Sequence, residues 1–133
     1  MKLVMHNDVQ QIARLEGWLE SVAEQYGVDP ILIPALNLAL EEAVTNVVLY
    51  AYPTDSRGEV ELTATCQDGQ LRFVLSDRGK PFDPTARPEV DITASLEDRP
   101  IGGLGIHLVR QIMDRVLYEY ADGKNILTMI KNI

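Results

Sequence analysis

The stretch Leu40-Glu41-Glu42-Ala43-Val44-Thr45-Asn46 places two adjacent carboxylates inside an otherwise apolar run. On an α-helix, Glu42 and Asn46 fall one above the other on the same face. A solvated helix face is the commoner explanation for such a glutamate pair, and this stretch alone leaves it open. Two later stretches favour a nucleotide site instead: Asp77-Arg78-Gly79-Lys80-Pro81 and a glycine cluster at positions 102, 103 and 105.

Length, composition and charge describe an ordinary globular domain with an acidic surface. A chain of 133 residues, of which 46% are hydrophobic, is long enough to bury one core, so we predict a single domain over residues 1–133. The net charge of -8 argues against a nucleic-acid partner, which would require clustered Lys and Arg. A small phosphate ligand stays compatible with this charge, because backbone amides at helix N-termini bind phosphate.

The cysteine content and the hydropathy pattern point to the cytoplasm. The single Cys66 cannot form an internal disulfide, and its place in an alternating strand pattern indicates a small buried residue. We find no apolar run approaching the length of a membrane span and no signal-peptide pattern at the N-terminus. We therefore predict a cytoplasmic protein without a membrane partner.

Capping residues and apolar spacing predict two helices in the first half of the chain. Asn7 or Asp8 is suited to start a helix that runs to about Tyr26 and ends at Gly27. Trp18 lies off the apolar stripe of this helix, and we expect it to pack rather than to form an interface. Asp29-Pro30 then offers a helix start, with a regular helix expected from about residue 34 to about residue 50.

Strict alternation of apolar and polar residues predicts strands and hairpins in the remainder. Residues 60–66 alternate, Asp68-Gly69 is a strong turn signal, and residues 71–75 return with the same pattern. A second hairpin is expected from residues 116–121 and 125–131 around Asp122-Gly123, and residues 1–5 suggest a short first strand. The predicted fold class is α+β: a two-layer α/β sandwich with a mostly antiparallel sheet and helices on one face.

Between Asp77 and Gly105 the regular pattern fails, because four prolines and many polar residues interrupt it. A loop of this length inside a compact domain is usually functional or disordered. Both of its ends carry site-like residues, so we predict that residues 83–101 form a lid over a ligand.

The two ends of this loop suggest a nucleotide site without proving one. A carboxylate at a strand end, as at Asp77, can accept a hydrogen bond from an exocyclic amine, although Asp-x-Gly alone is more often a turn. Gly102, Gly103 and Gly105 precede an amphipathic helix whose stripe we extend to Val116, and such a start can bind phosphate or act as a hinge. The pattern matches neither a P-loop nor a Rossmann fingerprint.

Taken in order, three motifs carry a resemblance to a known superfamily. They are Glu42-Ala-Val-Thr-Asn46, Asp77-Arg-Gly-Lys-Pro-Phe-Asp-Pro84 and Gly102-Gly-Leu-Gly-Ile106. The chain resembles, over nearly its whole length, the ATP-binding domain of the GHKL superfamily, which has the Bergerat fold. Within it, the chain is most similar to bacterial anti-sigma-factor serine kinases of the RsbW and SpoIIAB type.

This resemblance implies roles for particular residues. Asn46 would hold Mg²⁺ together with ATP phosphates and water, and Glu42 would be the general base for a substrate serine. Asp77 would bind the adenine amine, Gly79 would shape that pocket, and Thr128 would lie near adenine. The residues implied to contact ATP are Asn46, Asp77, Gly79, Gly102, Gly103, Leu104, Gly105 and Thr128.

The resemblance also implies partners, and two other functions stay open. The implied protein is an ATP-dependent serine kinase that sequesters a sigma factor, phosphorylates a STAS-type anti-anti-sigma protein, and forms a homodimer. The first alternative is a nucleotide-gated protein-binding regulator without efficient transfer. The second is an interaction domain that binds no nucleotide.

Overall fold

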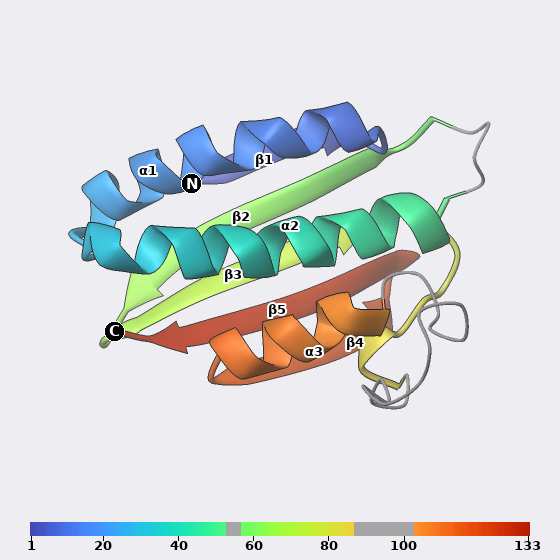
Figure 1. Ribbon diagram of the computed structural model, residues 1–133. Helices are drawn as coiled ribbons and strands as arrows, with labels where there is room; N and C mark the ends of the chain where they lie inside the picture. Colours follow the sequence, from blue (N-terminus) through green and yellow to red (C-terminus); the bar gives the residue numbers. More distant parts are fainter. Residues whose placement is uncertain (53–56, 87–102) are drawn as a thin grey trace.

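The computed structural model describes residues 1–52, 57–86 and 103–133, and within these ranges the chain forms one antiparallel sheet and three α-helices. Figure 1 shows the α-helices and strands along the chain. The strands are β1 (Lys2–His6), β2 (Glu59–Gln67), β3 (Gln70–Asp77), β4 (Arg115–Ala121) and β5 (Lys124–Asn132). The helices are α1 (Arg14–Tyr26), α2 (Ile33–Tyr50) and α3 (Gly103–Ile112), with 3-10 turns at Val9–Ala13, Pro30–Leu32 and Pro84–Ala86.

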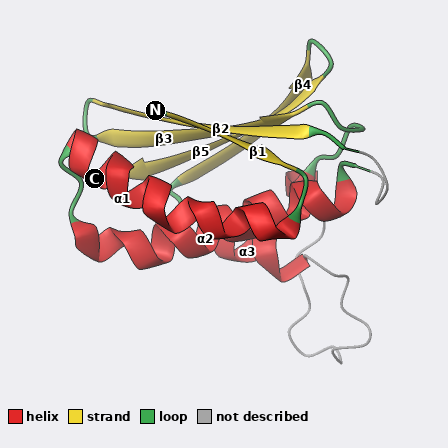
Figure 2. Ribbon diagram, turned by 90° about the horizontal axis from the view of Figure 1, so that it is seen from above, coloured by secondary structure: helices red, strands yellow, loops and turns green. Residues whose placement is uncertain are grey.

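The sheet has the order β1-β2-β3-β5-β4, and every neighbouring pair is antiparallel. All three helices lie on the same face of the sheet, as Figure 2 shows. The predicted α+β sandwich, with helices on one face, is therefore confirmed. The first strand, which the sequence only suggested, pairs with β2 along its whole length.

Both predicted hairpins form, and their turns explain the sequence signals. Asp68 and Gly69 have φ angles of 54° and 75°, and Asp122 and Gly123 have 55° and 74°. Positive φ at two successive residues produces a turn whose twist matches the flanking strands, and aspartate and glycine tolerate it best. The turns fix the register, so the apolar residues of β3 and β5 meet on the helix-covered face.

The helix boundaries follow the predicted caps, with one shift. Asp8 accepts a hydrogen bond from the backbone of Gln10, but it starts a 3-10 turn, and the α-helix begins only at Arg14. Gly27 ends α1 in the left-handed conformation, with φ of 66°. Asp29 caps the turn before α2 by accepting from the backbone of Ile31.

Trp18 of α1 is buried, as expected for a packing role. Its ring lies 6.2 Å from that of Phe73 on β3, measured between centroids, with the planes tilted by 56°. Phe73 itself is fully buried. This contact joins α1 to the centre of the sheet, since tilted aromatic pairs at such distances are favourable.

The segment Pro30–Tyr50, which contains α2, is long and apolar enough by composition to cross a membrane, with a mean hydropathy of 1.4. The expectation that no apolar run approaches this length was therefore wrong. Leu36, Leu40 and Val44 of this helix are buried in the domain core. A helix at the centre of a core is apolar around much of its circumference, which accounts for the hydropathy.

The predicted extension of the α3 stripe to Val116 was also wrong. The helix ends at Ile112, and Val116 belongs to β4, where it pairs with Met129. The helix does not continue through Asp114, because the backbone N–H of Asp114 donates to the carbonyl of Ile130 on β5 instead of to a carbonyl of α3. The short link between helix and strand leaves no residues for a further turn.

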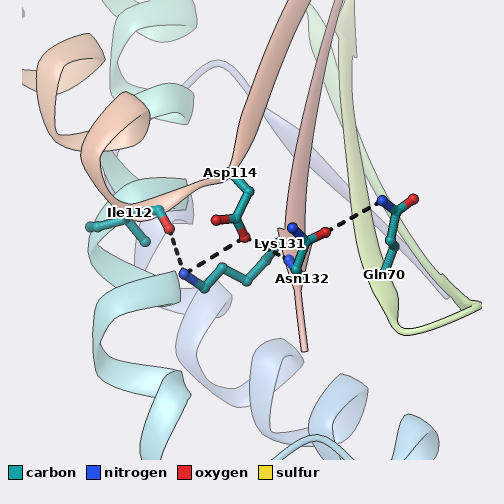
Figure 3. A network of polar contacts seen from close by, with 5 residues as sticks. All are labelled: Gln70, Ile112, Asp114, Lys131 and Asn132. Carbon is teal, nitrogen blue, oxygen red and sulfur yellow. Dashed lines mark hydrogen bonds and ion pairs between the residues drawn. The ribbon is translucent and has the colours of Figure 1, made fainter.

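A group of polar contacts holds this link against the end of the sheet (Figure 3). Lys131 donates to the carbonyl of Ile112 at 2.9 Å and lies 3.9 Å from the carboxylate of Asp114. The same carboxylate accepts from the backbone of Asn132 at 2.7 Å, and Gln70 donates to the side chain of Asn132 at 3.3 Å. A cation at the last carbonyls of a helix satisfies groups that have no partner within the helix.

Candidate functional site

A pocket lies between the second half of α2, the first turns of α3 and the ends of β3 and β5. The residues that line it are Ala43, Asn46, Val47, Leu75, Asp77, Phe82, Pro84, Ile106, Tyr118, Asn125 and Leu127. It is narrow, with about 20 Å³ of accessible space, which is room for roughly one water. A purine base would enter only if the lining side chains moved apart.

Asp77 occupies the end of β3 at the floor of this pocket and is only 4% exposed. Its Oδ1 accepts two hydrogen bonds, from the backbone of Gly79 and from Nδ2 of Asn125, both at 2.9 Å. Burial raises the pKa of the Asp77 carboxyl, and these two hydrogen bonds act in the opposite direction. Such a partly satisfied carboxylate in an apolar pocket is a candidate for binding a polar ligand group.

Gly79 lets the loop after β3 lie directly on the end of α2. A Cβ atom at this position would be 2.3 Å from the carbonyl oxygen of Ala51. The same oxygen accepts from the backbone of Lys80 at 2.9 Å. The absence of a side chain at Gly79 thus allows a close backbone approach, and this approach fixes the loop beside Asp77.

Asn46 projects into the pocket from α2 and is 4% exposed. Its side-chain amide makes no hydrogen bond with any part of the chain that the structure describes. A buried polar group without a partner costs free energy, so this amide is suited to a ligand atom. Glu42, one turn earlier, is half-buried and is not one of the residues that line the pocket.

The helix α3 begins at Gly103, and Ile106 in its first turn lines the pocket. The backbone N–H groups of a first helical turn have no acceptor within the helix and favour an anion. Gly103, Leu104 and Gly105 form the start of α3, and their contact with phosphate stays a prediction. Gly102 and most of the predicted lid, residues 87–101, lie outside the described residues.

In the described part of the chain, no cluster of three His, Cys, Asp or Glu side chains is arranged to hold a metal. A divalent cation at this site would have Asn46 as its protein ligand, and other oxygens would have to come from a ligand and water. That donor set fits Mg²⁺, which binds through few protein oxygens plus phosphates.

Thr128 is a correction to the predicted site. It pairs with Val74, whereas Leu127, the preceding residue, lines the pocket beside Asp77. Because successive side chains of a strand point to opposite faces, Thr128 faces the side of the sheet without helices. The side chain of Thr128 therefore does not line this pocket.

Asn125 and Tyr118 are pocket residues that the sequence reasoning missed. Asn125 lies near the start of β5, pairs directly with Asp77 on β3, and is 5% exposed. Tyr118 donates its hydroxyl to Oδ1 of Asn125. The signal was a polar residue at an inward position of an alternating strand, which is unusual unless it has a partner.

A wider groove of about 590 Å³ lies beside the open face of the sheet. Its charged lining includes Arg57, Arg78 and Lys124 together with Glu59 and Glu61. Among the predicted site residues that the structure describes, only Asp77 borders it. Two of the predicted site residues, Asn46 and Asp77, therefore meet at the narrow pocket.

Comparison with known proteins identifies the class. Residues 5–131 match the family described as the histidine kinase-like ATPase domain. A match over this much of the chain shows that the chain belongs to that family. The predicted superfamily is therefore confirmed, and with it the expectation of an ATPase-type fold.

Two curated relatives narrow the assignment within the family. The serine/threonine-protein kinase BtrW of Bordetella bronchiseptica is 30% identical over 112 residues, covering 84% of this chain and 79% of the relative. The serine-protein kinase RsbW of Listeria monocytogenes is 31% identical over 113 residues, covering 82% and 72%. The predicted subgroup, of the RsbW type, and the predicted enzyme class, serine/threonine-protein kinase, are confirmed.

A solved structure supports the fold. The structure of the RsbU and RsbW domains of a Mycobacterium tuberculosis protein aligns with a TM-score of 0.67 and 18% identity. The alignment covers 99% of this chain and 32% of that chain. At this identity the likeness concerns the fold alone.

Proposed function

We propose that this chain is a cytoplasmic, ATP-dependent serine kinase that acts as an anti-sigma factor. One observation carries the proposal: the buried carboxylate of Asp77, the amide of Asn46, which has no hydrogen-bond partner among the described residues, and Ile106 near the start of α3 line one pocket. The carboxylate, the amide and the backbone N–H groups at the start of α3 have the chemistry to bind the base, the metal-bound phosphates and the phosphate chain of one nucleotide. The relatives named as serine-protein kinases support the same activity.

In the proposed reaction, Asn46 would hold Mg²⁺, which would supply charge neutralisation for the phosphates. Gly102, Gly103, Leu104 and Gly105 offer backbone N–H groups to the phosphates. Glu42 accepts the proton of a protein serine hydroxyl while the serine oxygen bonds to the γ-phosphorus and ADP departs. Positioning and charge neutralisation supply most of the rate in such transfers.

The proposed partners follow from the family resemblance and the relatives' names. The phosphorylated protein would be an anti-anti-sigma protein of the STAS fold, and the sequestered partner a sigma factor. The chain would act as a homodimer and one domain over residues 1–133, with residues 83–101 closing over ATP. We propose no nucleic-acid or membrane partner.

A second candidate function is a regulator that binds the nucleotide but does not transfer its phosphate efficiently. Glu42 does not line the pocket. Unless binding of a protein substrate moves Glu42 to the γ-phosphate, this position favours a nucleotide-gated regulator that transfers no phosphate. Transfer of labelled phosphate to a STAS-type protein separates these two functions, because only the kinase transfers it.

The first experiment is thermal melting with and without Mg-ATP, for the wild type and the variants Asn46→Ala and Asp77→Asn. Nucleotide at a hundredfold excess over Kd stabilises a protein by about 2.7 kcal/mol, which a melting curve resolves. We expect an upward shift that both variants reduce strongly. If the melting temperature of the wild type does not shift at millimolar Mg-ATP, the chain does not bind the nucleotide, and both proposed functions are contradicted.

A further inference from the structure

The side chain of Asn125 uses every hydrogen-bonding position that it has. Its Nδ2 donates to Oδ1 of Asp77 at 2.9 Å and to the carbonyl of Lys80 at 2.8 Å. Its Oδ1 accepts from the backbone of Phe82 at 2.9 Å and from the hydroxyl of Tyr118 at 2.5 Å. An amide offers two donors and two acceptor sites. This amide is therefore saturated and held in one orientation.

The same network leaves one carboxylate oxygen of Asp77 for a ligand. Oδ1 is occupied by Gly79 and Asn125, whereas Oδ2 accepts from no residue in the described ranges. Nor does Oδ2 belong to the fully buried, unpaired atoms of those ranges, so it keeps some exposed surface, and Asp77 lines the pocket. Because Asn125 fixes Oδ1, it also fixes the direction in which Oδ2 presents its lone pairs.

The network also joins the pocket to the loop that follows β3. Asn125 binds the carbonyl of Lys80 and the N–H of Phe82, which lines the pocket and stacks on Tyr50 at 5.3 Å between ring centroids. The loop is thus anchored to β5 through one side chain. A change at Asn125 would free both the carboxylate and the loop wall that faces it.

We propose that Asn125, held by Tyr118, is a positioning residue that aims Oδ2 of Asp77 at the exocyclic amine of the bound purine. This rests on the proposed nucleotide function and goes beyond it, by assigning base selectivity to a residue that does not itself contact the amine. Both donors of Asn125 are occupied, so it cannot turn to bind a base carbonyl. The pocket consequently offers an acceptor and no side-chain donor from Asn125.

The test compares two nucleotides that differ only in the recognised group. ATP has a 6-amino group, and purine riboside triphosphate lacks it. Their Kd values are measured in Mg²⁺ by calorimetry for the full chain and three variants: Asn125→Ala, Tyr118→Phe and the control Tyr26→Phe. Tyr26 also donates its hydroxyl within the protein, to the carbonyl of Ala64, but it does not line the pocket.

We expect the wild type and Tyr26→Phe to prefer ATP by about 10- to 100-fold, as for a hydrogen bond to a charged group. Asn125→Ala should bring the ratio of the two Kd values close to one, while purine riboside triphosphate binds within about threefold of its wild-type affinity. Tyr118→Phe should lower the ratio by a smaller factor, since Asn125 keeps its other three bonds. That variant also keeps the test valid if Asn125→Ala fails to fold.

Three outcomes would overturn the inference. If the ratio of the two Kd values is unchanged in Asn125→Ala and Tyr118→Phe, and both nucleotides bind equally more weakly, the network supports the pocket without aiming Asp77 at the amine. If the wild type binds the two nucleotides equally well, Asp77 does not recognise the amine, although the proposed nucleotide function would stand. Binding of neither nucleotide by the wild type would remove the proposed function itself.

Discussion

The two ends of the pocket differ in how completely the protein satisfies its own polar groups, and we call them the base end and the phosphate end after the parts of ATP that we propose they bind. At the base end, Asp77 and Asn125 are joined to each other and to the loop after β3 by hydrogen bonds. At the phosphate end, Asn46 is just as buried but has no hydrogen-bond partner in the described part of the chain. The fold thus fixes the polar groups at one end, and at the other it leaves a buried amide that we propose a ligand completes.

This difference predicts which substitutions affect the stability of the ligand-free protein and which affect only its activity. Changes at the base end should alter the stability of the folded protein even without ligand, because they break internal contacts or, at Asp77, remove a buried charge. Changes at the phosphate end should spare the ligand-free protein and remove activity. The following substitutions test that contrast, from the largest expected effect to the smallest.

Glu42→Gln should give the largest effect, and only on catalysis. Removing a general base lowers the rate of transfer by about 10²- to 10⁴-fold, or roughly 3–5 kcal/mol of barrier. ATP affinity should stay at the wild-type value, because the glutamine keeps the size of the side chain and Glu42 does not line the pocket. Labelled phosphate transfer and ATP calorimetry measure the two quantities. Wild-type transfer by this variant would exclude Glu42 as the base.

Gly79→Ala should destabilise the ligand-free protein by about 1–3 kcal/mol, the usual cost of overpacking. The added Cβ would meet the carbonyl oxygen of Ala51 at 2.3 Å, where backbone rather than a flexible side chain must move. Denaturant unfolding measures the free energy of unfolding. Gly17→Ala is the matched control, because a Cβ at Gly17 meets nothing within 4 Å. Equal stability of the two variants would show that the loop after β3 yields freely.

Asp77→Asn should make the ligand-free protein more stable than the wild type at pH 7. Burial raises the pKa of Asp77 above its ordinary value of 3.8, so the folded state binds more protons than the unfolded state. The contribution of Asp77 to stability is then present at low pH and lost as pH rises through the folded pKa.

Asparagine carries no charge at any pH, so the difference between the two proteins should shrink as pH falls toward about 4. Chemical unfolding at a series of pH values measures it. A difference that stays constant with pH, or a less stable variant at pH 7, would show that Asp77 is not destabilised by burial.

Asn46→Ala should have the smallest effect on the ligand-free protein, and of the opposite sign to Gly79→Ala. It removes a buried amide that has no partner in residues 1–52, 57–86 and 103–133, and it adds a better helix former, for a gain of up to about 0.7 kcal/mol from helix propensity. Its melting temperature should therefore equal or exceed that of the wild type, while its response to Mg-ATP is largely lost. A clear loss of stability without ligand would mean that Asn46 has a structural partner after all.

The sequence by itself determined the order of the elements and the residues of one pocket wall. Caps at Asp8 and Asp29, and the Asp-Gly turns of both hairpins, are local signals, because they depend on φ angles and nearby backbone groups. The spacing of Glu42 and Asn46 is likewise fixed by one helix, and the alternation of β3 places Asp77 at its inner face.

Only the tertiary structure decided which residues meet across elements. Asp77 and Asn125 are 48 positions apart in the chain, and their partnership depends on the register of β3 and β5. The same register turned Thr128 away from the pocket, because a shift of one residue reverses the face of a side chain. Sequence periodicity carries no information on that pairing, whereas strand packing and turn geometry set it.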